Sequence, residues 1–233
     1  FNKFINQNSS LFNMILTTKN LRKEVPSGET NLVILDDITF NLEEGKSLAI
    51  TGPSGSGKST LLGLLAGLDT ATSGDIVLDG IKLNLLNEEE RAILRKDKVG
   101  FVFQSFELLP SLTALENVML PSELKSEENP KEKGKYFLER VGLSDRQNHY
   151  PNQLSGGEQQ RVAIARAFAC SAKILFADEP TGNLDQKNGK LISDLLFEVN
   201  SETDNALVIV THDQNLASQC DKKIELKLGK IVD

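Results

Sequence analysis

The stretch Gly52-Pro53-Ser54-Gly55-Ser56-Gly57-Lys58-Ser59-Thr60 decides the fold, because it fits the pattern G-x-x-x-x-G-K-[ST]. Its glycines let the backbone curl so that several N–H groups point inward at one anion. We expect Lys58 to reach the outer phosphates of a nucleotide as a point charge, and the hydroxyl of Ser59 to ligate Mg²⁺. The pattern therefore predicts a phosphate-binding loop.

The flanks of the loop suit that placement. A short apolar strand at 47–51 precedes it, and a buried helix at 58–67 follows and adds the positive end of its dipole. The apolar runs at 174–177 and 207–211 are typical of strands that helices cover on both faces, and a helical pattern at 191–199 lies between them. This alternation predicts an α/β fold with a mostly parallel sheet.

Short β-like runs at 15–17, 32–35 and 38–42 come before the loop, and we expect Pro26-Ser27-Gly28 to break the first two. Residues 1–13 are polar and rich in asparagine, which predicts a poorly ordered tail.

The middle of the chain differs from both ends. After a predicted strand at 99–103, residues 105–172 contain no convincing strand, and helical patterns occupy 114–119 and 131–141. We also expect a charged helix that Asn87 caps. The chain ends in a predicted hairpin around Gly229. A helical subdomain thus interrupts the sheet.

Two acids end the apolar run at 174–177. We expect Asp178 to hold Mg²⁺ and Glu179 to accept a proton from an attacking water. Both acids would lie at the carboxyl end of a strand, where ligands bind in open α/β sheets. An apolar strand that ends in Asp-Glu is by itself usually structural, but a phosphate loop in the same chain favours the catalytic reading.

A second helix start also has an anion-binding character. Ser155, Gly156 and Gly157 lie in the stretch Leu-Ser-Gly-Gly-Glu-Gln before an apolar-striped helix, and Ser155 with Glu158 fits a capping box. Helix N-termini attract anions, so this start could bind a second phosphate. The alternative is a capped helix with no ligand.

These motifs resemble those of the ABC ATPase family, for which Leu-Ser-Gly-Gly-Glu is close to diagnostic. Gln104 matches the family's Q-loop, the run 181–185 its D-loop, and His212 its H-loop. The resemblance covers about residues 15 to 232. Outside the motif set, Gln104 and His212 would be ordinary polar residues.

The resemblance implies a P-loop NTPase core with a mostly parallel sheet, an N-terminal antiparallel β subdomain and an inserted helical subdomain. Residues 14–233 would form one ABC ATPase domain after the tail at 1–13. The nucleotide-binding core with its β subdomain would occupy 14–104 and 173–233, and the helical subdomain 105–172.

The family also implies a head-to-tail homodimer that binds ATP and Mg²⁺. Each ATP would lie between the phosphate loop of one copy and Ser155–Gly157 of the other. His212 would hydrogen-bond the γ-phosphate, Gln104 would bind Mg²⁺ and sense the attacking water, and Asp185 would connect the two sites across the interface.

The stretches 100–118 and 176–185 look like those of the lipoprotein-releasing and macrolide-exporter ATPases. That subgroup implies an integral membrane permease partner, with which the chain would drive export, lipoprotein release or movement outside the membrane. We expect the permease to dock around Ser105–Leu112. The apolar residues there would anchor the permease or pack inside the helical subdomain: Phe106, Leu108, Leu109 and Leu112.

One position departs from the family. Val25 occupies the place where members usually carry an aromatic residue that stacks on adenine. Valine would pack less selectively on the base, so a preference for ATP over GTP is implied by the family alone.

Bulk properties limit the partners. A net charge of -7 argues against nucleic-acid binding, and no apolar run approaches the roughly 18 to 20 residues of a membrane span. Cys170 and Cys220 lack metal-like spacing and fit a reducing cytosol. The cysteines thus favour a cytoplasmic protein, and the family resemblance implies that it is peripheral on the cytoplasmic face of the bacterial inner membrane.

Three other classes of function compete with transport: a soluble ABC ATPase of DNA repair or translation, a P-loop kinase, and a structural clamp. An ABC ATPase of DNA repair would insert coiled coils, and one of translation would usually carry two cassettes. A P-loop kinase would lack the Leu-Ser-Gly-Gly-Glu stretch. The strongest alternative is an ATP-gated structural clamp, as in cell-division ABC complexes.

Overall fold

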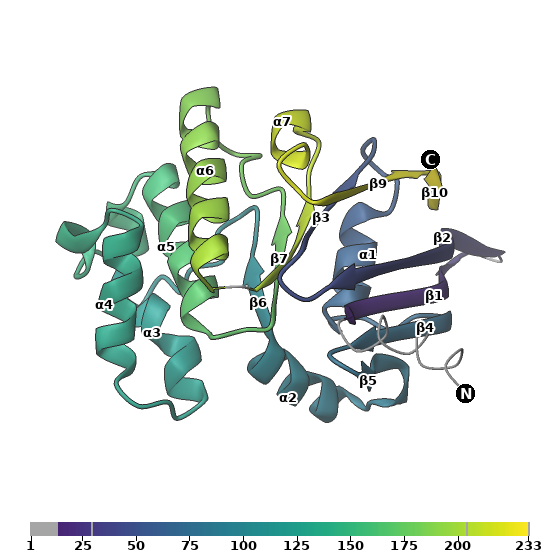
Figure 1. The fold of residues 1–233 in the computed structure, drawn as a ribbon, viewed down its shortest axis with the longest axis horizontal. Coiled ribbons are helices and arrows are strands. Elements are labelled where there is room, and N and C mark those ends of the chain that lie inside the picture. Colours follow the sequence, from purple (N-terminus) through teal and green to yellow (C-terminus); the bar gives the residue numbers. More distant parts are fainter. Residues whose placement is uncertain (1–13, 29, 204, 233) are drawn as a thin grey trace, which may run out of the picture.

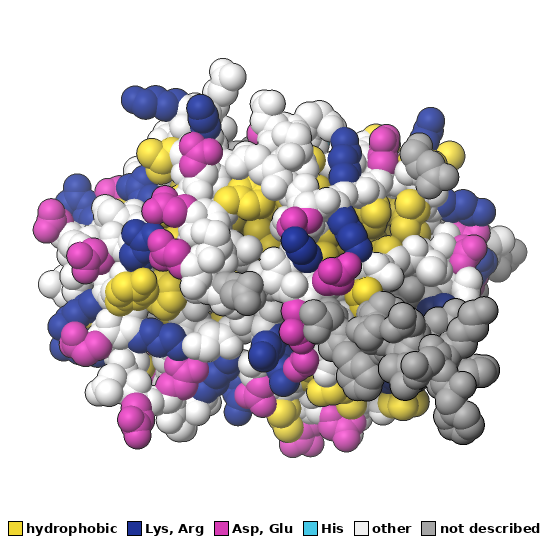
Figure 2. Space-filling view, in the orientation of Figure 1, with side chains coloured by type: hydrophobic (Ala, Val, Ile, Leu, Met, Phe, Trp, Pro, Cys, Tyr) yellow, Lys and Arg dark blue, Asp and Glu magenta, His cyan; other side chains and the backbone are white. Residues whose placement is uncertain are grey.

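The computed structural model describes residues 14–28, 30–203 and 205–232, so the predicted tail at 1–13 lies outside the described residues. Figure 1 shows the arrangement: strands β1, β2 and β4 lie on one side, helices α3, α4 and α5 on the other, and a central sheet between them. The fold class expected from the sequence is confirmed. Figure 2 shows acidic and basic side chains interspersed over the same face of the molecule.

The central sheet has six strands in the order β10-β9-β3-β8-β7-β6. All of its pairs are parallel except the hairpin of β9 and β10 at the end of the chain. Its strands, in chain order, are β3 (Ser47–Thr51), β6 (Val99–Val102), β7 (Ile174–Asp178), β8 (Ala206–Val210), β9 (Lys222–Lys227) and β10 (Lys230–Val232).

Both faces of this sheet are buried, as the continuous apolar runs predicted. Ile174 and Phe176 of β7 belong to a core that includes α1 (Lys58–Leu65), whereas Leu175 and Ala177 belong to a core shared with α5 (Gly156–Ala169) and α6 (Gln186–Thr203). Because side chains alternate along a strand, one apolar strand supplies two cores.

The second sheet is antiparallel and has four strands in the order β2-β1-β4-β5. They are β1 (Met14–Ser27), β2 (Thr30–Glu43), β4 (Ser73–Leu78) and β5 (Ile81–Lys82). The predicted break between the first two runs is confirmed at Gly28, where the chain turns from β1 into β2, but β1 itself continues through Pro26 and Ser27. The last pair of β1 with β4 is Arg22 with Ser73, so Pro26 has a strand neighbour on one side only and needs no donor on the other.

The predicted runs 32–35 and 38–42 also form one strand, β2. Asp37 has a φ of 58° near their junction, and the pairing with β1 shifts register in this region. A bulge of this kind bends a strand without ending it, which explains why the sequence suggested two strands.

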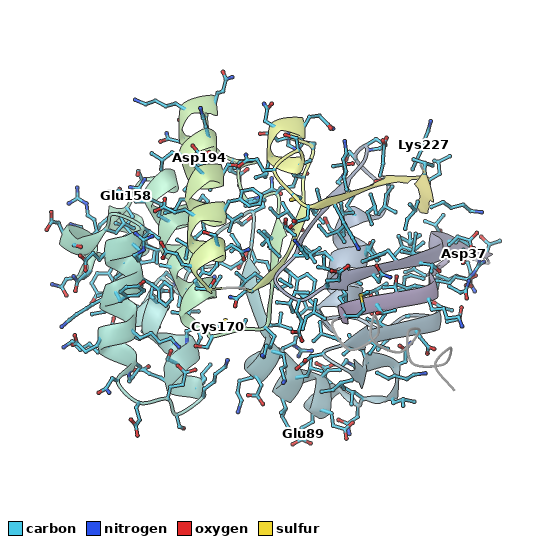
Figure 3. All side chains as sticks on the ribbon, viewed as in Figure 1. Asp37, Glu89, Glu158, Cys170, Asp194 and Lys227 are labelled. Atoms are coloured by element: carbon cyan, nitrogen blue, oxygen red, sulfur yellow. The ribbon has the colours of Figure 1, made fainter. Side chains whose placement is uncertain are left out.

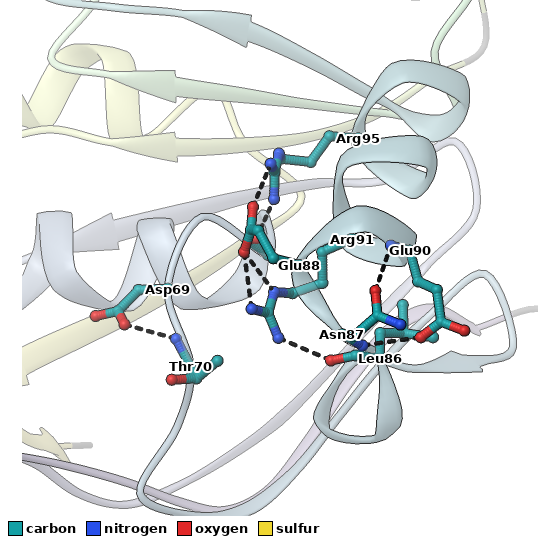
Figure 4. Close-up of polar contacts among 9 residues, drawn as sticks. Asp69, Thr70, Leu86, Asn87, Glu88, Glu90, Arg91 and Arg95 are labelled. Atoms are coloured by element: carbon teal, nitrogen blue, oxygen red, sulfur yellow. Dashed lines mark hydrogen bonds and ion pairs between the residues drawn. The ribbon is translucent and has the colours of Figure 1, made fainter.

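Helix α2 (Glu88–Lys98) begins where the sequence predicted. Asn87 Oδ1 accepts a bond of 3.0 Å from the N–H of Glu90, and Glu90 Oε2 accepts one of 2.8 Å from the N–H of Asn87 (Figure 4). Glu88 pairs with both Arg91 and Arg95, which hold its pKa below the ordinary value.

Between β6 and β7 lie α3 (Ala114–Leu124), α4 (Pro130–Arg140) and α5, and the described residues there include no strand. At the sheet end of this block, a Cβ on Gly100 of β6 would lie 2.9 Å from the carbonyl oxygen of Ala167 and 3.1 Å from Cys170 Sγ. Glycine therefore lets the last turn of α5 lie directly against β6. The chain closes with the short helix α7 (Gln214–Ala217) before β9.

Candidate active site

The phosphate loop joins β3 to α1 and depends on its glycines. Gly52 has a φ of 141° and Gly57 one of 99°, both in the region that favours glycine. A Cβ on Gly52 would lie 2.1 Å from the carbonyl oxygen of Leu226, and one on Gly57 would lie 2.8 Å from Leu35 Cδ2. Backbone geometry and neighbours therefore both require glycine here.

The start of α1 has no side-chain cap, so its first N–H groups are available to an anion. Its cap residue, Gly57, has no side chain to satisfy the first N–H groups, and the first turn contains no acid. Lys58 Nζ donates to the carbonyl oxygens of Gly52 and Pro53, each at 2.9 Å, so the ammonium is held over the loop. Positive charge and unpaired helix donors thus face the same space.

The two acids meet this loop as the sequence predicted. Ser59 Oγ donates to Asp178 Oδ1 over 3.4 Å, which joins the start of α1 to the end of β7. Burial raises the pKa of Asp178, against the effect of the bond from Ser59, and the charge of Glu179 raises it further. A bound divalent cation would reverse this shift.

Glu179 contacts His212 across the neighbouring strand ends. Glu179 Oε2 lies 2.8 Å from His212 Nδ1 and accepts a bond of 3.3 Å from the N–H of His212. The side chain of Glu179 is 15% exposed and that of His212 is 71% exposed. Glu179 has a φ of 45°, and its N–H donates to the carbonyl of Val210, so β8 holds this carboxylate at the sheet edge.

Gln104 follows β6 and is tied to the segment after Glu179. Asn183 Nδ2 donates to the carbonyl of Gln104 over 2.9 Å, and Gln104 Nε2 donates back to Asn183 Oδ1 over 3.4 Å. No role was predicted for Asn183. Its place in the run 181–185, directly after the acids, was the signal that could have found it.

These residues surround one hollow of about 590 Å³, within the size range of small-molecule sites. Ile34 supplies an apolar wall that was not predicted, because its local pattern indicates only a strand residue. Ser56, by contrast, is buried behind the loop. The lining comprises Ile34, Gly52, Pro53, Ser54, Gly55, Gly57, Lys58, Ser59, Thr60, Gln104, Glu179 and His212.

Seven predicted site residues are not part of this lining: Ser56, Asp178, Val25, Ser155, Gly156, Gly157 and Asp185. Val25 is half-buried in β1 and pairs with Leu32 of β2. Asp185 Oδ1 accepts bonds of 3.0 Å from the N–H groups of Lys187 and Asn188 and so holds the start of α6.

Ser155 caps α5 as predicted. Its N–H donates to Glu158 Oε2 over 2.8 Å, and its Oγ accepts a bond of 3.3 Å from the N–H of Glu158. The N–H and the hydroxyl of Ser155 both donate to Glu158 Oε2, and these two bonds, with the nearby charge of Arg146, lower the pKa of Glu158 to about 2. Figure 3 labels Glu158 on the helical side of the molecule.

A family model described as ABC transporter matches residues 35–182. The chain therefore belongs to the ABC transporter family, among its ATP-binding proteins. The family recognised in the sequence and the prediction of an ABC-type ATPase are both confirmed. No helix in the described part of the chain is long and apolar enough to cross a membrane.

Its relatives include the ABC transporter ATP-binding protein YbbA of Escherichia coli (strain K12), 50% identical over 219 residues that cover 93% of this chain and 96% of YbbA. The lipoprotein-releasing system ATP-binding protein LolD of Treponema denticola is 47% identical over 219 residues, 93% of this chain and 97% of LolD. A solved dimer of the cassette MJ0796 of Methanocaldococcus jannaschii, bound to ADP and Pi, matches with a TM-score of 0.86 and 44% identity over 94% of this chain and 97% of that one.

Proposed function

We propose that two copies of this chain close on two ATP molecules and thereby power a membrane permease of the lipoprotein-releasing and macrolide-exporter type. The chain would be peripheral to the permease, on the cytoplasmic face of the membrane. The relation to LolD supports the subgroup, and the dimer of MJ0796 supports the paired arrangement.

One observation carries the proposal: the predicted ATP-contacting residues divide into two groups. The phosphate loop, Gln104, Glu179 and His212 line one hollow, whereas Ser155–Gly157 lie outside it at the start of another helix. Ser155 is exposed, so a second molecule can approach it. A head-to-tail pair would bring this helix start to the partner's phosphate loop.

The residues of the hollow would share the work of hydrolysis. Lys58 and the first N–H groups of α1 bind the phosphates and neutralise their charge. Glu179, held by His212, orients water for in-line attack and accepts its proton. Gln104, fixed by Asn183, lines the same space from the end of β6. Such catalysis works by positioning and charge neutralisation.

Ser59 and Asp178 fit a magnesium ion, because a hydroxyl and a carboxylate oxygen lie 3.4 Å apart at the edge of the phosphate loop. When bound there, Mg²⁺ would neutralise charge on the phosphates. The task of the protein is to keep both oxygen donors on rigid elements, the start of α1 and the end of β7.

The permease would dock beside Ser105–Leu112. Leu109 is exposed there, but Phe106 and Leu112 are half-buried and Leu108 packs against the core of the helical block, so most of the expected anchors point inward. An adjoining hollow of about 300 Å³ offers a better apolar contact. Its lining includes Phe101, Phe103 and Leu124, with Arg95 and Lys96 at its edge.

The test is to capture the Glu179→Gln chain with Mg²⁺ and ATP from detergent-solubilised membranes. We expect a partner with four membrane spans and a large periplasmic region, and size-exclusion chromatography with light scattering should show two copies of the chain. Co-purification of regulators of cell-wall hydrolases would favour the structural clamp instead. A chain that stays monomeric with ATP would contradict the paired mechanism.

A further inference from the structure

Arg166, in the last turn of α5, binds the segment that follows Gln104. Its Nη1 donates to the carbonyl oxygen of Glu107 over 2.6 Å, and its Nη2 donates to that of Phe106 over 2.9 Å. Both acceptors have left-handed backbones, with φ of 64° at Phe106 and 49° at Glu107. Non-glycine residues rarely adopt this conformation in succession, so the turn needs an external support.

The surroundings of Arg166 show that it supports backbone rather than pairing charge. Burial lowers the pKa of Arg166, against the opposing charge of Glu107. Among the ion pairs of the described residues, none includes Arg166. Its two bonds are charge-assisted bonds to carbonyl oxygens, which are stronger than neutral ones.

The same turn also touches the start of α5. A Cβ on Gly156 would lie 3.8 Å from Phe106 Cζ, so the Phe106 ring reaches the glycine next to Ser155. Long side chains on a helix point back toward its N-terminus, which lets Arg166 meet the same turn from the other end. Figure 3 shows the span, with Glu158 labelled near one end of α5 and Cys170 just beyond the other.

We propose that Arg166 is a positioning residue, which fixes the Phe106–Glu107 turn to α5 so that ATP binding at the Ser155 end changes the surface offered to the permease. A contact at Ser155 would shift α5, and Arg166 with Phe106 would carry the shift to the turn beside Gln104. This rests on the proposed docking of the permease near Ser105–Leu112 and on the paired use of ATP.

The test is hydrogen exchange on the Glu179→Gln chain, with and without Mg²⁺ and ATP. We expect ATP to slow exchange at both 52–60 and 105–109. Adding Arg166→Gln should speed exchange at 105–109 about tenfold and remove its response to ATP, while the slowing at 52–60 persists. Arg166→Lys, which keeps the charge and fewer donors, should fall between the two.

Arg140→Gln is the matched control, because Arg140 lies on the same helical block and pairs with Glu198 and Glu202 at the surface. It should respond to ATP like the parent chain. Unchanged exchange at 105–109 in Arg166→Gln would overturn the proposal, as would loss of the 52–60 response in both Arg166 variants, which would indicate a general structural role. No slowing at 52–60 in the parent chain would instead contradict the proposed ATP binding.

Discussion

Helices α1 and α5 are both proposed to bind a phosphate at their N-termini, yet their starts are built in opposite ways. Helix α1 follows a glycine cap that makes no side-chain bond and has no acid in its first turn. Helix α5 follows Ser155, which forms a complete capping box with Glu158, an acid in the first turn. The first N–H groups of α1 are therefore available to a ligand, whereas those of α5 are partly satisfied by hydrogen bonds within the chain.

This difference predicts that ATP binds first at the phosphate loop. An anion at α1 meets unpaired N–H groups and Lys58, whereas an anion at α5 meets a carboxylate already held by Ser155. Affinity should therefore reside mainly at the phosphate loop. The start of α5 would add only the binding free energy by which a closed pair of subunits differs from two separate ones.

The largest test of this division is Glu179→Gln, which removes the proposed proton acceptor and leaves both helix starts intact. We expect ATP turnover to fall by about 10²–10⁴-fold with ATP affinity unchanged, because general base catalysis contributes about that factor. Turnover is measured by phosphate release and binding by titration. Glu139→Gln, an exposed acid on α4, should behave like the parent. Normal turnover in Glu179→Gln would remove the role assigned to Glu179.

A second test compares the two helix starts directly. Lys58→Gln should weaken ATP binding by about 10–100-fold, since a bond to a charged group contributes about 1.5–3 kcal/mol. Ser155→Ala should change ATP binding by less than about twofold at dilutions where the chain is monomeric, because that end adds only the closing increment. Fluorescent-nucleotide titration measures both. Equal losses in the two variants would mean that both starts contact ATP within one copy.

A third test concerns the base end of the α1 site. Val25→Tyr should tighten ATP binding about fivefold or more, because stacking of an aromatic ring on a base is worth about 1–3 kcal/mol in nucleic-acid sites. Isothermal titration with ATP and with GTP measures affinity and selectivity. Exposed Lys227→Tyr on β9 controls for an added ring. Unchanged affinity would place Val25 away from the base, with Ile34 as the remaining apolar contact.

The smallest effect belongs to the cap of α5. Glu158→Gln should lower the Tm by about 2–4 °C at pH 7, because it removes a negative charge at a helix N-terminus that contributes up to about 1 kcal/mol, although glutamine can still accept the bond from Ser155. The folded pKa of Glu158 is about 2 against an ordinary 4.5, so its stabilisation is full above pH 4.5 and is lost as the pH falls through about 2. Thermal melts across that range should show this loss in the parent only. A variant with the same pH dependence would exclude Glu158 as its source.

Most of the parallel core and of the hollow could be predicted, because local patterns set them. Apolar runs marked β3, β7 and β8, and the carboxyl ends of parallel strands meet at one sheet edge, so the acids and His212 converge there. The cap of α2 followed from Asn87 and Glu90 alone.

The remaining features depend on neighbours distant in the chain. Pro26 continues a strand only because β4 no longer flanks β1 there, and Ile34 meets the phosphate loop only after β2 folds over it. Asn183 bonds to a backbone carbonyl 79 positions away, and Arg166 bonds to two carbonyls 59 and 60 positions away. No local pattern announces such a partner.

Gly100 places the last turn of α5 at a position where the helix could pivot if the proposed pair of subunits closes. A Cβ there would meet Leu175 of β7 and the carbonyl oxygen of Ala167 in the last turn of α5, while Ser155 at the other end is exposed. At a rise of 1.5 Å per residue, Ser155 lies about 18 Å along the helix from this contact. A tilt of α5 by about 5° would therefore move Ser155 by about 1.6 Å. Gly100→Ala would push the last turn of α5 away from β6. Normal dimer closure in this variant would show that α5 does not pivot there.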